Sequence, residues 1–228
     1  IYHIGYMLGP RINAGGRVGK SSHGADLLLN NNPKDAFKIA SELDQFNKER
    51  QYLEKDVLDK IQKKMSLDTS KPVIIITGKN LHEGVIGIVA SRIKDKFNKP
   101  VIIISINKDI GKASARSIVG FDIGSAIISA TQENILIKGG GHKMAGGFSI
   151  KADKIDEFKD FIFKKFKSVH KDILNERPLY LDSVISPTAI NLDFYRKVYT
   201  LAPFGSGNPE PKFIIENVRT VNSKIIKD

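Results

Sequence analysis

The chain has 228 residues, of which 41% are hydrophobic and 27% are charged, a composition typical of a folded globular protein. Its 36 Lys and Arg residues outnumber its 25 Asp and Glu residues, so the formal net charge is +11. This excess favours an anionic partner, with nucleic acid ahead of a membrane surface. The absence of cysteine excludes disulfides, thiolate metal sites and a cysteine nucleophile. No apolar run approaches the ~20 residues that a membrane-spanning helix needs.

The two ends of the chain suggest a piece of a longer protein. The first residue is Ile1, and the last four, Ile225–Asp228, resemble an unfinished strand. We therefore expect an internal fragment. Near the start, Gly9 to Gly19 predicts a Gly-rich loop with several basic residues. Ala14–Ser21 partly matches a phosphate-binding P-loop, but no buried strand precedes it, so the loop binds a polyanion or is only a basic turn.

A long helix is predicted next. Asn32 and Pro33 are typical of an N-cap and a first helical position, and Asp35 lies near the positive end of the helix dipole. Apolar residues then recur at spacings of three, four or seven, which predicts one apolar stripe on a helix of about 30 residues. They are Ile39, Leu43, Phe46, Leu53, Val57 and Ile61. We expect a connector between two domains rather than a part of one core.

Residues 65–175 alternate between strand and helix patterns, which predicts one compact α/β domain. A β-branched strand at 72–77, a helix at 82–97 and a second strand at 101–106 predict a parallel strand pair. Further along, a strand at 112–118, a helix at 122–130, a Gly-rich loop at 139–142, a strand at 148–150 and a helix at 155–170 are expected.

The character of the sequence changes after Pro178. Alternating segments at 179–185, 212–218 and 221–226 predict strands, with a short helix at 189–200 and a loop at 203–211 between them. This is the start of a β-rich domain that is too short to close into a barrel.

No convincing metal site is predicted. His82 and Glu83 begin the pattern of a zinc protease helix, but Ile86 stands in the place of the second histidine. His82 precedes a predicted helix, where it either caps the helix or meets a phosphate.

Two segments are candidates for binding an anion. Ser114 and Arg116 face the same side of a predicted strand and offer a hydroxyl and a guanidinium to a phosphate, although an edge strand with outward polar residues explains them equally well. Gly139–Gly147 has five glycines in nine residues, and His142 follows the first three. This density favours a close approach of the backbone to a ligand.

Five segments together resemble the RecJ-type single-strand-specific exonucleases of the DHH phosphoesterase superfamily. They are Leu8–Arg17, His82–Arg92, Ser114–Ser117, Gly139–Gly147 and Pro203–Pro211. The resemblance covers nearly the whole chain.

The resemblance implies an α/β fold with four parts. Residues 1–30 are the end of a DHH catalytic domain, and 31–66 are a connector helix. Residues 67–176 are a DHH-associated substrate-binding domain with a mixed sheet, and 177–228 begin an OB-fold. The implied parent degrades single-stranded DNA from its 5′ end in repair and recombination. Its catalytic lobe holds two Mn²⁺ or Mg²⁺ ions with Asp and His side chains. A single-strand-binding protein and a helicase are implied partners, and the bacterial cytoplasm, at the nucleoid, is the implied location.

No Asp-His-His motif is present, so the resemblance implies binding roles and no catalytic or metal-binding residues in this fragment, which is expected to be inactive alone. The implied phosphate-binding residues are Arg116, Ser114 and His142, helped by Arg17, Asn13 and Arg11, with His82 and the backbone of Gly140 and Gly141 as weaker candidates. Two alternatives stay open: a DHH phosphoesterase acting on short oligonucleotides or cyclic dinucleotides, and a non-catalytic nucleic-acid-binding module.

Overall fold

A computed structural model describes residues 2–64, 68–169, 179–205, 207–219 and 221–224. The chain divides into two compact units, Tyr6–Glu176 and a second unit formed by Ile1–Gly5 with Arg177–Asp228.

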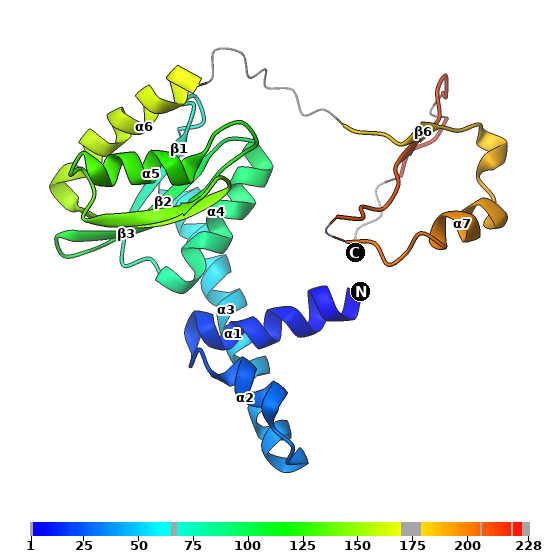
Figure 1. Cartoon of the computed structure of the whole chain (residues 1–228), viewed down its shortest axis with the longest axis horizontal. Helices are drawn as coiled ribbons and strands as arrows, with labels where there is room; N and C mark the ends of the chain where they lie inside the picture. The colour runs from blue at the N-terminus through cyan, green and yellow to red at the C-terminus, as the bar shows by residue number, and fades with distance from the viewer. Residues whose placement is uncertain (1, 65–67, 170–178, 206, 220, 225–228) are drawn as a thin grey trace. The chain divides into compact units, whose positions relative to one another are not determined.

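The larger unit is a mixed α/β structure (Figure 1). Its helices are α1 (Gly9–Val18), α2 (His23–Leu29), α3 (Pro33–Lys64), α4 (Glu83–Phe97), α5 (Ile123–Gln132) and α6 (Ile155–Val169). A π-helical segment (His3–Leu8) precedes α1, and a 3-10 turn (Ala152–Lys154) precedes α6. Its strands are β1 (Ile74–Lys79), β2 (Val101–Asn107), β3 (Ile110–Arg116), β4 (Lys138–His142) and β5 (Ala145–Lys151).

The five strands form one sheet in the order β1-β2-β3-β5-β4. β1 and β2 are parallel and joined through α4, whereas the other pairings are antiparallel. The predicted mixed sheet and its parallel strand–helix–strand unit are therefore confirmed.

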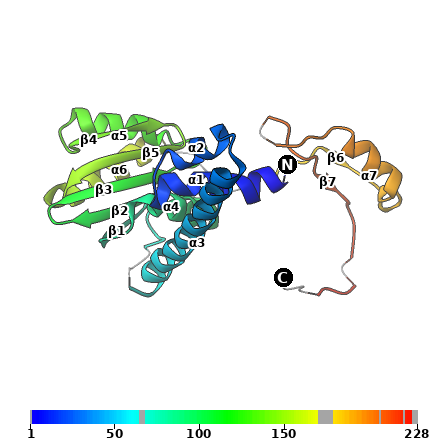
Figure 2. The same ribbon diagram turned by 90° about the horizontal axis from the view of Figure 1, so that it is seen from below.

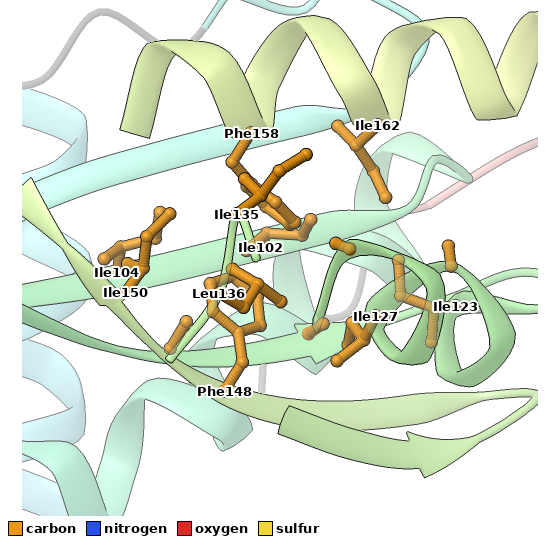
Figure 3. Packing of buried hydrophobic residues seen from close by; sticks show 14 of the residues in the cluster. Ile102, Ile104, Ile123, Ile127, Ile135, Leu136, Phe148, Ile150, Phe158 and Ile162 are labelled. Carbon is orange, nitrogen blue, oxygen red and sulfur yellow. The ribbon is translucent and has the colours of Figure 1, made fainter. Parts of the chain in front are cut away.

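Helices cover both faces of this sheet, with α5 and α6 on one side and α3 and α4 on the other (Figure 2). The first face carries the larger core, in which Ile102 and Ile104 of β2 and Phe148 and Ile150 of β5 pack under helix residues such as Phe158 (Figure 3). The opposite core joins α3, α4, β1 and β2. The sheet is thus buried on both faces where β2 lies, which explains the continuous Val101–Ile104 run.

The long helix α3 begins where the sequence predicts, because Asn32 Oδ1 accepts a hydrogen bond from the backbone N–H of Lys34 at 3.0 Å. It is not only a connector, however. Val57 and Ile61, in its C-terminal half, are buried in the core beside α4. The expectation that this helix lies outside any one core is therefore wrong for that half.

Two segments that we expected to be loops because of their glycines are regular elements. Residues 9–18 form α1, where Gly15 packs so closely that an added Cβ would lie 2.7 Å from the carbonyl oxygen of Lys20 and 3.3 Å from Leu43. Residues 138–142 form the edge strand β4, where a Cβ on Gly139 would lie 2.7 Å from Ile127 of α5. In both places glycine permits close packing rather than a loop.

The smaller unit has short elements. β6 (Ser183–Val184) pairs in parallel with β7 (Phe213–Ile214), and a 3-10 turn (Pro187–Ala189) and α7 (Leu192–Tyr199) lie between them in the chain. The strands expected over 179–185 and 212–218 are far shorter, because each has only the other as a ladder partner among the described residues. Residues 221–224 form no strand, and residues 225 and 226 lie outside the described residues.

None of the helices in the described part of the chain is both long enough and apolar enough to span a bilayer.

Candidate nucleic-acid interface

Ser114 and Arg116 lie side by side on β3, as their alternation predicts. Arg116 Nη1 donates to Ser114 Oγ at 3.1 Å and to the carbonyl oxygen of Ala115 at 2.8 Å. The guanidinium therefore leans along the strand toward the Ser114 hydroxyl, and its remaining N–H groups stay available to a ligand.

The first turns of α4 lie directly against this pair. A Cβ on Gly87 would be 2.8 Å from Arg116 Nη2 and 2.9 Å from Ser114 Oγ, so only glycine allows this approach without moving a side chain. His82 caps the helix, because its Nδ1 accepts a hydrogen bond from the backbone N–H of Gly84 at 3.2 Å. That bond leaves Nε2 as the nitrogen that can donate to a ligand.

Helix α1 brings a second guanidinium to the same place. The carbonyl oxygen of Arg17 would be 2.1 Å from a Cβ on Gly84, and Arg17 Nη1 lies 3.5 Å from the carbonyl oxygen of Gly84. Asn13, four residues earlier, shares a face of α1 with Arg17, and both are exposed.

The electrostatics of this cluster favour an anion. Burial, and after it the positive charge of Arg17, lower the pKa of the Arg116 guanidinium below its usual value. Among the residues that the structure describes, neither arginine forms an ion pair with a carboxylate. Two neighbouring cations without a counter-charge are stabilised by a bound anion such as a phosphate.

Arg11 is not brought to this cluster. Its Nε pairs with Asp44 Oδ1 of α3 at 2.7 Å, and its Nη1 donates to the carbonyl oxygen of Met7 at 2.8 Å. Two residues along a helix turn a side chain by about 200°, so Arg11 points away from the face that carries Asn13. Its observed contacts join α1 to α3.

The hairpin of β5 and β4 extends the same face of the sheet. Arg116 is opposite Ala145, and Ala145 is opposite His142, so these three residues share one face. His142 is exposed, and its Nδ1 accepts from the backbone N–H of Met144 at 3.3 Å, which holds the ring near the turn.

The glycines of this hairpin divide into two groups. Gly140 and Gly147 lie opposite each other in the row of Ser114, and a Cβ would meet nothing within 4 Å at Gly140 and only the carbonyl oxygen of Ala113, at 3.4 Å, at Gly147. Gly141 instead packs closely against the partner strand of its own hairpin, since a Cβ there would lie 2.3 Å from the carbonyl oxygen of Ala145. The backbone at Gly140 is therefore open to a ligand, whereas close packing explains why position 141 is a glycine.

A groove of about 430 Å³ crosses this face between α4 and β4. It is lined by Ser114 and Gly140 and also by Lys112, Lys138 and Ser149, which sequence analysis missed. The period-2 pattern that joins Ser114 to Arg116 also reaches Lys112, but the partner strands could not be aligned with it from sequence alone.

Within the described ranges, no group of three or more His, Asp or Glu side chains could hold a metal ion. The guanidinium, ammonium and hydroxyl groups of this face are of the kind that bind phosphates.

Comparison with known proteins assigns the two units. Residues 70–168 match the DHHA1 domain, and residues 181–228 match the RecJ OB domain. The single-stranded-DNA-specific exonuclease RecJ of Bacillus subtilis is 32% identical over 94% of this chain and 27% of its own length. RecJ of Escherichia coli is 33% identical over 92% of this chain and 38% of its own length. The chain thus spans roughly a quarter to two-fifths of these relatives.

The fold agrees with a solved relative. The crystal structure of RecJ in complex with Mn²⁺ from Thermus thermophilus superimposes with a TM-score of 0.82 at 30% identity, over 93% of this chain and 31% of that one. A second crystal structure, in complex with Mg²⁺, gives a TM-score of 0.79. With a DHHA1 domain, a RecJ OB domain and this structural match, the chain belongs to the RecJ family.

Proposed function

We propose that this chain is the substrate-binding part of a single-strand-specific 5′→3′ exonuclease that hydrolyses phosphodiester bonds. The observation that carries the proposal is the meeting of Arg116, Ser114 and Arg17, two guanidiniums and a hydroxyl with no carboxylate counter-ion among the described residues. The relatives named above are single-stranded-DNA-specific exonucleases, and a phosphate-binding face suits that substrate.

The proposal assigns a part to each segment. Residues 1–30 complete a DHH catalytic domain, 31–66 connect it, 67–176 bind the strand, and 177–228 begin the OB domain. Hydrolysis in the whole enzyme uses two Mn²⁺ or Mg²⁺ ions held by the DHH domain, so this chain alone is inactive. In this scheme the whole enzyme acts in DNA repair and recombination in the bacterial cytoplasm, at the nucleoid, with a single-strand-binding protein and a helicase.

Within this chain the residues bind and orient the strand. Arg116, Ser114 and Arg17 hold the 5′-terminal phosphate, helped by Asn13 and by His142 from the hairpin turn. His82 Nε2 contributes from the N-cap of α4 and the Gly140 backbone from the groove, while Arg11 and Gly141 act through packing. Because the contacts are to phosphates, binding does not depend on base sequence. The match of residues 181–228 to the RecJ OB domain favours a RecJ-type substrate over a short oligonucleotide or a cyclic dinucleotide.

Replacing Arg116 tests the proposal. Arg116→Ala removes a half-buried guanidinium from the phosphate site, so the affinity for a 5′-phosphorylated oligothymidylate should fall by about tenfold or more. The slope of the logarithm of the affinity against the logarithm of the salt concentration should become shallower by about 0.7 for each phosphate that the variant no longer neutralises. Fluorescence anisotropy at several salt concentrations measures both. Lys164→Ala, on the opposite side of the sheet, removes an equal charge as the control. Equal losses in the two variants, or no loss in Arg116→Ala, would reject the site.

A further inference from the structure

A row of cationic and polar side chains crosses the groove beside the phosphate site. Lys112 of β3 is opposite Ser149 of β5, and Ser149 is opposite Lys138 of β4. Residues opposite each other share a face, and Lys112 lies two residues from Ser114 along β3, so this row is on the same face of the sheet as Ser114. All three residues line the groove together with Ser114. The groove therefore leads from the phosphate site to a second set of donors.

The charges of this row are available to a ligand. Lys138 is exposed and, within the described part of the chain, forms no ion pair. Lys112 Nζ pairs with Glu83 Oε2 of α4 at 2.8 Å, but the two side chains are 58% and 48% exposed. Ion pairs this exposed are worth little, so Lys112 can exchange the Glu83 carboxylate for another anion at small cost.

The floor of the groove beside Ser114 is free of side chains. Ser114 is opposite Gly147, and Gly147 is opposite Gly140, where no atom lies within 4 Å of a Cβ position. Two residues along a strand span about 6.7 Å, and neighbouring strands lie about 4.8 Å apart. A lysine ammonium on its flexible four-carbon stem covers these distances. An anionic group joined to a phosphate at Ser114 can therefore lie between Lys112 and Lys138.

The proposed function decides which part of a strand reaches this row. A 5′-terminal phosphate is bonded to the first sugar on one side, and any further phosphates of the same end extend from its other side. The first internucleotide phosphate is the one that is cleaved, so in the proposed function it lies at metal ions held outside this chain. The group that enters the groove from the phosphate site is therefore one that extends from the 5′ end, away from the first sugar.

We infer that Lys112, Lys138 and Ser149 form a subsite for the β- and γ-phosphates of a strand that begins with a 5′-diphosphate or 5′-triphosphate, whose α-phosphate is held by Arg116 and Ser114. Ammonium and hydroxyl groups are suitable donors for these phosphates. The inference rests on the proposed function and deepens it, because it adds strands with a 5′-polyphosphate end to the substrate class. Glu83 competes with the polyphosphate for Lys112 and so limits its affinity.

The test compares two ends of one oligonucleotide. Trithymidylate with a 5′-monophosphate and trithymidylate with a 5′-triphosphate are labelled at the 3′ end and titrated at one salt concentration without divalent cations. The unsubstituted chain should bind the triphosphate end about tenfold more tightly. Lys112→Ala/Lys138→Ala should abolish this preference and leave the affinity for the monophosphate end nearly unchanged. Glu83→Gln should strengthen the preference, because it removes the competing carboxylate.

Lys164→Ala/Lys167→Ala is the control for the total charge. It removes two exposed lysines of α6, which packs on the other face of the sheet, and should leave the preference unchanged.

Two kinds of failure are distinguishable. The subsite is overturned if the unsubstituted chain has no preference for the triphosphate end, if both double variants lose the preference equally, or if Lys112→Ala/Lys138→Ala weakens binding of both ends equally. In each of these cases a loss of monophosphate binding in Arg116→Ala still supports the proposed function. Monophosphate binding that does not depend on Arg116 overturns both.

Discussion

Gly84 and Gly87 both lie in the first turns of α4, yet a methyl group would meet different neighbours at each. At Gly87 the nearest atoms are the ends of two side chains, Arg116 Nη2 and Ser114 Oγ. At Gly84 the nearest atom is the backbone carbonyl oxygen of Arg17, at 2.1 Å. A flexible side chain can move aside, whereas a helix backbone cannot move without repacking. A substitution at Gly87 should therefore affect ligand binding, and a substitution at Gly84 should affect the stability of the fold.

Gly87→Ala should weaken binding of single-stranded DNA several-fold, because the methyl group displaces the Arg116 guanidinium from Ser114. The variant should unfold at an unchanged or slightly higher temperature, since Ala is favoured over Gly within a helix by about 1 kcal/mol. Anisotropy and thermal unfolding measure the two effects.

Gly84→Ala is the matched variant. It must push α1 away from α4, so its melting temperature should fall, with a loss of about 1–3 kcal/mol typical of overpacking. If Gly87→Ala instead loses stability and keeps its affinity, the placement of Arg116 beside α4 is wrong.

Asp122 shows a residue-scale effect of pH. Its Oδ1 accepts a hydrogen bond from the backbone N–H of Ser125 at 2.9 Å and caps α5, and this bond is the main reason that the pKa of its carboxyl lies below its usual value. A lowered pKa in the folded state means that the cap stabilises the fold above the ordinary Asp pKa of about 3.9. This stabilisation is lost as the pH falls through the folded-state pKa.

Asp122→Ala should therefore lower the free energy of unfolding by about 1 kcal/mol at pH 7. The difference in this free energy between the variant and the unsubstituted chain should become smaller below about pH 4. Asp122→Asn keeps the capping oxygen and should cost much less. Urea unfolding between pH 7 and pH 3 measures these differences. A gap that does not change with pH would show that the charge of Asp122 has no part in the cap.

The candidate site was only partly predictable at this scale. Ser114 and Arg116 could be paired from strand alternation alone, and their contact is confirmed. Lys112 lay on the same alternation, but its partners Ser149 and Lys138 depend on a register that sequence does not reveal. The ion pair of Arg11 with Asp44 likewise depends on how α1 packs on α3.

At the scale of elements, one buried carboxylate fixes α3 against α4. The side chain of Glu54 on α3 is 2% exposed and forms ion pairs with Arg50, at 2.9 Å, and with Arg92 of α4. Arg50 also donates to Asn47, which is buried too. The arrangement holds the helix that precedes the sheet against the helix that forms one wall of the groove.

Glu54→Ala should lower the free energy of unfolding by about 2–3 kcal/mol, because it leaves Arg50 partly buried without a counter-charge. Asp56→Ala is the control, since the Asp56–Lys60 pair on the same helix is exposed and should contribute less than about 1 kcal/mol. Urea unfolding of both variants makes the comparison. Equal losses would contradict a special role for the buried pair.

Most elements of the larger unit follow from hydrophobic periodicity, and the exceptions share a cause. The strands at 74–79 and 101–107 and the helices at 83–97, 123–132 and 155–169 lie close to their predicted bounds. The glycines led to wrong predictions of loops at α1 and β4, because Gly15 and Gly139 permit close packing against residues distant in sequence. Local patterns report the periodicity of an element but not the space left by its neighbours.

At the scale of the whole molecule, both hydrophobic cores and the face that we propose to bind phosphates belong to the larger unit, Tyr6–Glu176. α5 and α6 bury one face of the sheet (Figure 2). On the other face, α4 packs on β2 and β3, while Gly140 of β4 faces open space. The basic residues of the groove, Lys112 and Lys138, therefore lie on strands of the sheet rather than on loops, and we expect them to be in position before a strand of DNA binds.

Mapping a bound strand by NMR tests most directly whether single-stranded DNA binds the face centred on Arg116. A 5′-phosphorylated trithymidylate is titrated into the ¹⁵N-labelled chain, and the shifts of the backbone amides are followed. Binding at the proposed face should shift amides of residues 84–87, 112–117 and 138–149, and should leave those of α6, residues 155–169, in place. Shifts confined to α6 or to the smaller unit would contradict a strand-binding face centred on Arg116.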